Sequence, residues 1–362
     1  MTIEIIDTNR NELAFFGRLQ QSLSDHRILL IPLALYAAAY EVLHITHPET
    51  GAAHLFKGVG LIYLTFIPML LLGLSLMCFY HVVRYVKPES PTRALLSELK
   101  TFLSSPARLA NGIPALFIVS VLAFVFSDVQ SNILTLQPDT WDQTFSEWDQ
   151  YIHFGKQPWQ WVQPFLGYAP ITSLINVNYN LWFFMMMIFL IYFGFAEKTN
   201  ILRTRFFLSF MGIWIVSGNI LAVWLASAGP CYFGRLGLAP DPYAAQMDYL
   251  RHANEILPVW AVNLQDMLWA GHLQSIEGSV VSAMPSLHNG SALLFALAAF
   301  QVSNFWGRIV AAHAALIYVG SFHLGWHYAI DSYVAWAVTL AIWFASAPLA
   351  KWWHQKMEPL EN

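Results

Sequence analysis

The sequence predicts an all-α membrane protein: a polytopic helix bundle with about eight transmembrane helices and interfacial helices on its outer face. Of the 362 residues, 57% are hydrophobic and 11% are charged, whereas soluble domains carry roughly 25% charged residues. Several apolar runs approach the length of about 20 residues that crosses a bilayer. We expect helices at 28–45, 59–83, 110–125, 181–196, 206–228, 286–303, 309–322 and 328–347. The runs 181–196 and 309–322 are short and need flanking residues to cross.

The basic residues are distributed unevenly, and this asymmetry predicts the orientation of the chain. Lys and Arg in short loops stay on the cytoplasmic side of a membrane. Fourteen of the 18 lie in the N-terminal segment, in every second loop or after the last run, and only Lys57, Lys156, Arg235 and Arg251 lie in the alternate loops. We therefore expect both termini in the cytoplasm. We expect a bacterial inner membrane, with the alternate loops on its periplasmic side.

Two long segments, 128–180 and 229–285, separate apolar runs on the predicted outer side. The first is rich in tryptophan, which prefers the membrane–water interface, so we expect its helices to lie along the outer surface. An ordinary loop packed on the bundle is the alternative. We divide the chain into an N-terminal part (1–140, three transmembrane helices and a cytoplasmic loop), a catalytic membrane domain (141–350) and a cytoplasmic tail (351–362).

Other features narrow the class of protein. The two cysteines, Cys78 and Cys231, fall in different predicted zones, which argues against a disulfide framework. The N-terminus is polar and lacks the basic-then-apolar order of a cleaved signal peptide, so we expect the first helix to remain. The net charge of -4 is too small to indicate nucleic-acid binding. The expected partner at this point is the bilayer, and the sequence leaves the oligomeric state open.

Two polar motifs stand where apolar runs begin on the predicted outer side. The second, H-Y-A-I-D, places His327 and Asp331 four residues apart, a spacing that puts two side chains on one face of a helix. A carboxylate at that position accepts a hydrogen bond from one ring nitrogen and leaves the other nitrogen unprotonated. No hydrolase-type serine or cysteine accompanies the pair, so His327 itself is the candidate nucleophile. Such a nucleophile suits attack on phosphorus.

The first motif, P-S-L-H, supplies groups that complement this nucleophile. His288 is the candidate general acid, because an imidazole protonates a leaving alkoxide well. Pro285 is tolerated in a first helical turn. Ser286 and the free N–H groups of the helix start can hold an anion. Because ionisable groups near membrane spans mark function, these residues predict a phosphate site between the mouths of two helices.

Two other classes of function compete with this interpretation. His323, His327 and Asp331 lie at i, i+4 and i+8 and, with His288, would make a four-ligand zinc site of a transmembrane hydrolase. Gly325 argues against the continuous helix that this site requires. A proton-coupled transporter would place ionisable residues near the middle of the membrane, and Asp, Glu, Lys and Arg are absent from the middles of the predicted spans.

The paired motifs resemble those of the type 2 phosphatidic acid phosphatase superfamily, which carries P-S-x-H and H-x-x-x-D elements on neighbouring helices. "MPSLH" and "HYAID" are most similar to the branch that contains inositol phosphorylceramide synthase, as are "SAGPCYF" at 227–233 and "WDQYIHFGKQPWQW" at 148–161. The resemblance covers roughly residues 141–336. It implies a lipid phosphatase or an inositolphosphotransferase-like enzyme of sphingolipid metabolism, with a phospholipid or other lipid phosphate as its substrate.

The resemblance also implies roles for individual residues. His327 attacks phosphorus and forms a phosphohistidine, Asp331 orients it and His288 protonates the leaving group. Water or a lipid alcohol then takes the phosphoryl group, and no metal or cofactor takes part. The sequence departs from the family in lacking its upstream K-x6-R-P element and in having Ser321 where an arginine is usual. Arg235 is therefore the first candidate for binding phosphate, followed by His323 and Lys156.

Overall fold

The structure is a helix bundle, as the sequence predicts. The computed structural model describes residues 15–47, 55–138, 140–273 and 282–357, and within these ranges it has helices and turns but no strand. Seven described helical segments are long and apolar enough to cross a membrane: Arg27–Thr46 (α2), Ile67–Val86, Pro106–Ser131 (α5), Ala169–Gly194 (α9), Ile201–Trp224, Asn304–His323 (α15) and Ala329–Met357 (α16). A shorter apolar helix, Leu287–Val302 (α14), accompanies them. The chain is therefore an integral membrane protein.

Two of these segments combine several elements. Ile67–Val86 is the second part of α3 (Leu55–His81) together with the π-helical turn η2 (Val82–Val86). Ile201–Trp224 comprises α10 (Ile201–Ile215), the π-helical η3 (Val216–Leu221) and α11 (Ala222–Trp224). Between the first of these and α5 lies the amphipathic α4 (Pro91–Leu103), which has no buried residue.

The ends of the helices follow local capping signals that the apolar runs alone did not include. The Ser303 hydroxyl accepts a hydrogen bond from the Phe305 N–H at 3.3 Å and starts α15, and the Asn200 side chain caps α10 by accepting from the Arg203 N–H at 2.8 Å. The two runs expected to be short, 181–196 and 309–322, are helices of 26 and 20 residues. α9 starts twelve residues earlier than predicted because its first turns carry polar residues that face protein rather than lipid.

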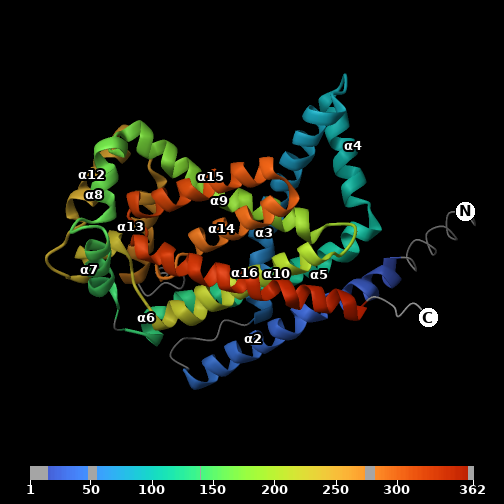
Figure 1. Ribbon diagram of the computed structural model, residues 1–362, viewed down its shortest axis with the longest axis horizontal. Helices are drawn as coiled ribbons and strands as arrows, with labels where there is room; N and C mark the ends of the chain where they lie inside the picture. Colours follow the sequence, from blue (N-terminus) through green and yellow to red (C-terminus); the bar gives the residue numbers. More distant parts are fainter. Residues whose placement is uncertain (1–14, 48–54, 139, 274–281, 358–362) are drawn as a thin grey trace, which may run out of the picture.

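The central helix α14 is the short crossing element. It packs against α9, α10, α15 and α16, as Figure 1 shows in the middle of the bundle. At 1.5 Å per residue its 16 residues span about 24 Å, less than the roughly 30 Å of a hydrocarbon core. An irregular segment, Ser282–Ser286, precedes it. Irregular backbone at membrane depth requires protein partners, and here the Ala283 N–H donates to the Ser227 carbonyl at 2.8 Å.

One end of the bundle carries the short outer helices. Figure 1 shows α7 (Asp142–Ile152), α8 (Pro158–Leu166), α12 (Ala244–Ile256) and α13 (Trp260–Leu273) together at the left, with α7 running across the direction of α16. The start of α2 and the end of α16 lie at the opposite end. The tryptophan-rich segment 128–180 thus contains short helices, including α6 (Ile133–Leu136), followed by the first turns of α9.

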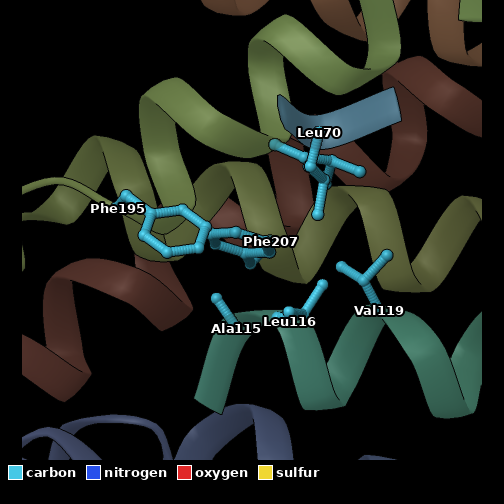
Figure 2. Close-up of a pocket in the computed structure, with 7 residues that line it drawn as sticks. Leu70, Ala115, Leu116, Val119, Phe195 and Phe207 are labelled. Carbon is cyan, nitrogen blue, oxygen red and sulfur yellow. The ribbon is translucent and has the colours of Figure 1, made fainter. Parts of the chain in front are cut away.

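An apolar pocket lies between the membrane-spanning helices. Seven apolar residues from α3, α5, α9, α10 and the position that follows α9 line it, six of which Figure 2 labels: Leu70, Ala115, Leu116, Val119, Phe195 and Phe207. None of the predicted site residues lies among them. The pocket is therefore a packing gap between helices, and the functional site has to be sought at the helix ends.

Candidate functional site

His327 lies in the turn that joins α15 to α16. α15 ends at His323, and Gly325 adopts a left-handed conformation with φ of 75°. The N–H groups of Trp326 and His327 both donate to the Ser321 carbonyl, at 3.0 and 3.1 Å. α16 begins only at Ala329. The expectation that His327 and Asp331 share one helical face was therefore wrong in detail, because His327 precedes the helix and Asp331 lies in its first turn.

The imidazole of His327 is nevertheless held by Asp331. Its Nδ1 is 3.2 Å from Asp331 Oδ2 and 2.9 Å from the backbone carbonyl of Ala283. A carbonyl oxygen can only accept, so the proton resides on Nδ1. Within the described residues, Nε2 has no hydrogen-bond partner. The ring is thus fixed in the tautomer whose free lone pair is on Nε2, which is the form that a histidine nucleophile needs.

His288 faces this pair from the first turn of α14. Its ring centroid is 6.2 Å from that of His327. Two aromatic rings of α9 pack on the His288 imidazole: Tyr179 at 4.7 Å and Trp182 at 4.3 Å between centroids. Trp182 is itself fixed, because its indole N–H donates to the Ser291 hydroxyl at 2.9 Å. The structure therefore brings the two histidines and Asp331 together at the mouths of α14 and α16.

Ser286 belongs to the same place but has a structural partner. Its hydroxyl oxygen accepts from the Asn289 N–H at 3.4 Å and from the Asn289 amide at 3.0 Å, so it caps α14. Pro285 consequently precedes the cap and does not lie in the first helical turn as expected. An N-cap at Ser286 leaves the N–H groups of Leu287 and His288 without an intrahelical acceptor. These two groups can bind an anion at the helix start.

The other three predicted binding residues have partners of their own. The guanidinium of Arg235 pairs with Asp266 and lies near the rings of Tyr232 and Trp269. His323 is buried, with Nε2 at 3.0 Å from the Thr172 hydroxyl. Lys156 is exposed, with its ammonium 4.8 Å from the centre of the Trp161 ring. No direct contact with His327 or His288 is seen for these three among the described residues.

The zinc alternative loses its geometric basis in this structure. It needs His323, His327 and Asp331 on one continuous helix, but the helix is interrupted at Leu324–Tyr328. His323 ends α15 and bonds to α9, whereas Asp331 lies in α16. In the part of the chain that the structure describes, no group of three or more potential metal ligands comes together.

Two carboxylates of α7, which the sequence reasoning missed, hold the loops of the site in place. Asp142 accepts from the N–H groups of Ala228 and Gly229, at 2.9 and 2.8 Å, and from the Tyr328 hydroxyl at 2.8 Å. Asp149 accepts from the N–H groups of Ala329 and Ile330, at 2.7 and 3.0 Å, at the start of α16. The two residues are seven apart, which places them on one helical face. This spacing of two aspartates is the feature of the sequence that could have identified them.

Burial gives Asp149 an unusual protonation equilibrium. Its carboxyl is 1% exposed. Desolvation raises its pKa to about 7, although the Ala329 and Ile330 N–H groups favour the ionised form; the nearby charge of Asp331 raises the pKa further. The group that anchors the start of α16 therefore titrates near neutral pH.

Gly229 in the "SAGPCYF" stretch is required by close packing against the turn between α15 and α16. It has φ of 93°, and a Cβ there would lie 2.7 Å from the Trp326 carbonyl oxygen. Cys231, two residues further along the chain, donates its N–H to the Gly325 carbonyl at 2.9 Å. The stretch therefore supports the turn that carries His327.

Comparisons with known proteins agree with this geometry. A model of the PAP2 superfamily matches residues 143–345, more than half of the chain and the part that contains α7, both histidine motifs and the turn between α15 and α16. Searches of curated proteins and of solved structures found no match. The match supports the superfamily and does not select the inositol phosphorylceramide synthase-like branch. The chain belongs to the PAP2 superfamily.

Proposed function

We propose that this protein is a membrane lipid phosphatase or phosphotransferase that works through a phosphohistidine on His327. Membership of the PAP2 superfamily supports a membrane phosphatase or phosphotransferase in general. The single observation that carries the specific proposal is the double anchoring of Nδ1 by the Ala283 carbonyl and Asp331. This anchoring presents the Nε2 lone pair on a ring that is almost buried.

The proposed reaction has two steps. In the first, Nε2 of His327 attacks phosphorus, the bond from phosphorus to the lipid oxygen breaks, and His288 gives its proton to the departing oxygen. In the second, His288 takes a proton from water or from an alcohol, whose oxygen attacks phosphorus and breaks the phosphorus–nitrogen bond. Asp331 stabilises the positive charge that the imidazole carries in the intermediate.

The proposal assigns phosphate binding to the start of α14. The N–H groups of Leu287 and His288, with Ser286 as the cap, are the nearest donors. Arg235 is proposed as the cation that leaves its ion pair with Asp266 and binds the substrate phosphate. His323 and Lys156 are proposed as further phosphate-binding residues. The lipid is proposed to be a phospholipid, with an inositol-containing head group and a sphingolipid alcohol as the preferred pair on the strength of the motif resemblance.

We further propose that the site faces the periplasm of a bacterial inner membrane. The fourteen-to-four distribution of basic residues supports cytoplasmic termini. The position of α7, α8, α12 and α13 at the end of the bundle opposite the end of α16 is consistent with this orientation. Residues 141–350 are proposed as the catalytic domain, 1–140 as the N-terminal transmembrane part and 351–362 as the tail.

Replacement of the nucleophile tests the proposed function. His327→Asn places an amide N–H where Nδ1–H lies, so the bond to Ala283 can be kept, but it removes Nε2. We expect phosphate release from phosphatidic acid in mixed micelles to be abolished while the protein remains folded. His252→Asn is the matched control, because His252 is an exposed residue of α12. Near-normal turnover by His327→Asn would exclude His327 as the nucleophile.

A further inference from the structure

One face of α9 carries polar residues toward the two histidine motifs. Thr172, Asn176 and Tyr179 lie at i, i+4 and i+7, so they share a helical face, and all three are buried. The Thr172 hydroxyl contacts His323 at 3.0 Å, and the Tyr179 ring stacks on His288 with an interplanar angle of 20°. α9 therefore lies beside His288 of the candidate site and beside His323 at the end of α15.

The hydroxyl of Tyr179 has no partner in the part of the chain that the structure describes. Thr172 bonds to His323 and to the Tyr249 hydroxyl. The Asn176 side-chain oxygen accepts from the Ala261 N–H at 3.1 Å, while its amide nitrogen has no partner among the described residues. The Tyr179 side chain belongs to a residue that is 6% exposed, and no described residue hydrogen-bonds to its hydroxyl. Buried tyrosine hydroxyls usually have a partner, because an unpaired buried donor destabilises the fold.

Packing does not explain this hydroxyl. The ring alone makes the contacts with His288 and with Gly320, whose added Cβ would meet Tyr179 Cδ2 at 3.1 Å. A phenylalanine would make the same contacts without burying an unpaired polar group. The ring that carries the hydroxyl stacks on His288, whose ring centroid is 6.2 Å from that of His327, so Tyr179 belongs to the candidate site.

We propose that Tyr179 is a catalytic residue whose hydroxyl donates a hydrogen bond to a non-bridging oxygen of the phosphoryl group that His327 attacks. This inference rests on the proposed function. The charge of a phosphoryl group in its transition state is spread over its three equatorial oxygens, and a donor that is already in place stabilises that charge. Tyr179 keeps its proton throughout, so no bond to it breaks.

Tyr179→Phe tests this role because it removes the hydroxyl and keeps the ring against His288. We expect kcat/KM to fall about 10²-fold, since removal of one such donor costs about 10²–10³ in rate. The loss should be equal on phosphatidic acid and on nitrophenyl phosphate, because the donor acts on the phosphoryl group and not on the leaving group. The inhibition constant of vanadate, which mimics the five-coordinate phosphorus, should rise by a similar factor.

Two further readouts separate this role from a structural one. The melting temperature of Tyr179→Phe should equal or exceed that of the wild type, because an unpaired buried hydroxyl is removed. Tyr192→Phe, on the same helix but with a ring that is 48% exposed, should change neither activity nor vanadate inhibition. Unchanged vanadate inhibition in Tyr179→Phe would overturn the inference, and so would a loss of activity that parallels a loss of thermal stability.

The outcome for Tyr179 is distinguishable from the outcome for the proposed function. If His327→Asn is inactive and Tyr179→Phe is fully active, only the inference about Tyr179 fails. If His327→Asn retains activity, the proposed function fails whatever the result for Tyr179, and the inference fails with it.

Discussion

Asp331→Asn is expected to be much less damaging than the corresponding change in a serine protease triad. There, the substitution costs about 10⁴-fold because the amide leaves the histidine in the wrong tautomer. Here the Ala283 carbonyl, 2.9 Å from Nδ1 of His327, holds the proton on Nδ1 independently of residue 331. The N–H of Tyr328 donates to the same Asp331 oxygen at 3.0 Å. It can bind only the oxygen of an amide, so it orients the new side chain with that oxygen toward His327.

The remaining loss comes from the missing negative charge. A hydrogen bond to a charged group contributes about 1.5–3 kcal/mol, against about 0.5–1.5 kcal/mol for a neutral one, so at least about 1 kcal/mol is lost. Two unit charges about 4 Å apart interact by about 4 kcal/mol at an effective dielectric constant near 20, which sets the upper limit. At about 1.4 kcal/mol per factor of ten, kcat should fall between about 5-fold and 10³-fold.

The assay is phosphate release from phosphatidic acid in mixed micelles at saturating substrate. Asp248→Asn is the matched control, since the Asp248 side chain on α12 is 78% exposed, and it should have wild-type activity. A loss in Asp331→Asn as complete as that of His327→Asn would refute the reasoning, because it would mean that the Ala283 carbonyl does not hold the tautomer.

Three further predictions address proton donation to the leaving group, the Asp149 carboxyl that holds the start of α16, and the orientation of the protein in the membrane. His288→Ala should slow phosphatidic acid hydrolysis by about 10²–10⁴-fold but nitrophenyl phosphate hydrolysis far less, because nitrophenolate leaves without a proton; equal losses would exclude a general acid. Burial raises the pKa of Asp149 in the folded protein from 3.8 to about 7. Between these two pH values the folded state binds a proton at Asp149 that the unfolded state does not bind. The stability that this proton contributes is lost as the pH rises toward and through 7. The melting temperature of the wild type should therefore fall more steeply from pH 5 to 8 than that of Asp149→Asn, and identical slopes would contradict the raised pKa. The orientation is tested by labelling a cysteine introduced in a predicted outer loop. Gly278 lies in such a loop but outside the described residues. Glu255→Cys is used instead, because the Glu255 side chain is 76% exposed. It should react with an impermeant thiol reagent in intact cells, whereas Lys198→Cys should react only after lysis; the reverse pattern would invert the orientation.

The fold, and the three residues that the structure brings together at the starts of α14 and α16, were accessible from the sequence for simple physical reasons. Apolar runs of bilayer length predict membrane helices whatever the fold, and the structure confirms the helix bundle. Ionisable residues at the mouths of such helices are costly, which singled out His288, His327 and Asp331. The helix boundaries were less accessible, because the start of α9 is polar where it packs against protein, as at Thr172 and Asn176.

The supporting groups were not predictable in the same way. The acceptor that fixes His327 is the backbone carbonyl of Ala283, and a carbonyl is present at every residue, so the sequence carries no sign of it. Asp142 and Asp149 contact residues some 80 to 190 positions away, and only the tertiary fold specifies such partners. Arg235 attracted attention as an arginine near a motif, but its pairing with Asp266 depends on how α13 packs.

The most direct test of the account is detection of the phosphohistidine itself. Phosphatidic acid labelled with radioactive phosphorus is mixed with the protein in micelles, the reaction is stopped in alkali within the first turnover, and the labelled residue is identified by peptide mapping. The account predicts an alkali-stable, acid-labile label on His327 in the wild type and in His252→Asn, and no label in His327→Asn. A label that survives acid, or one that persists in His327→Asn, would contradict it.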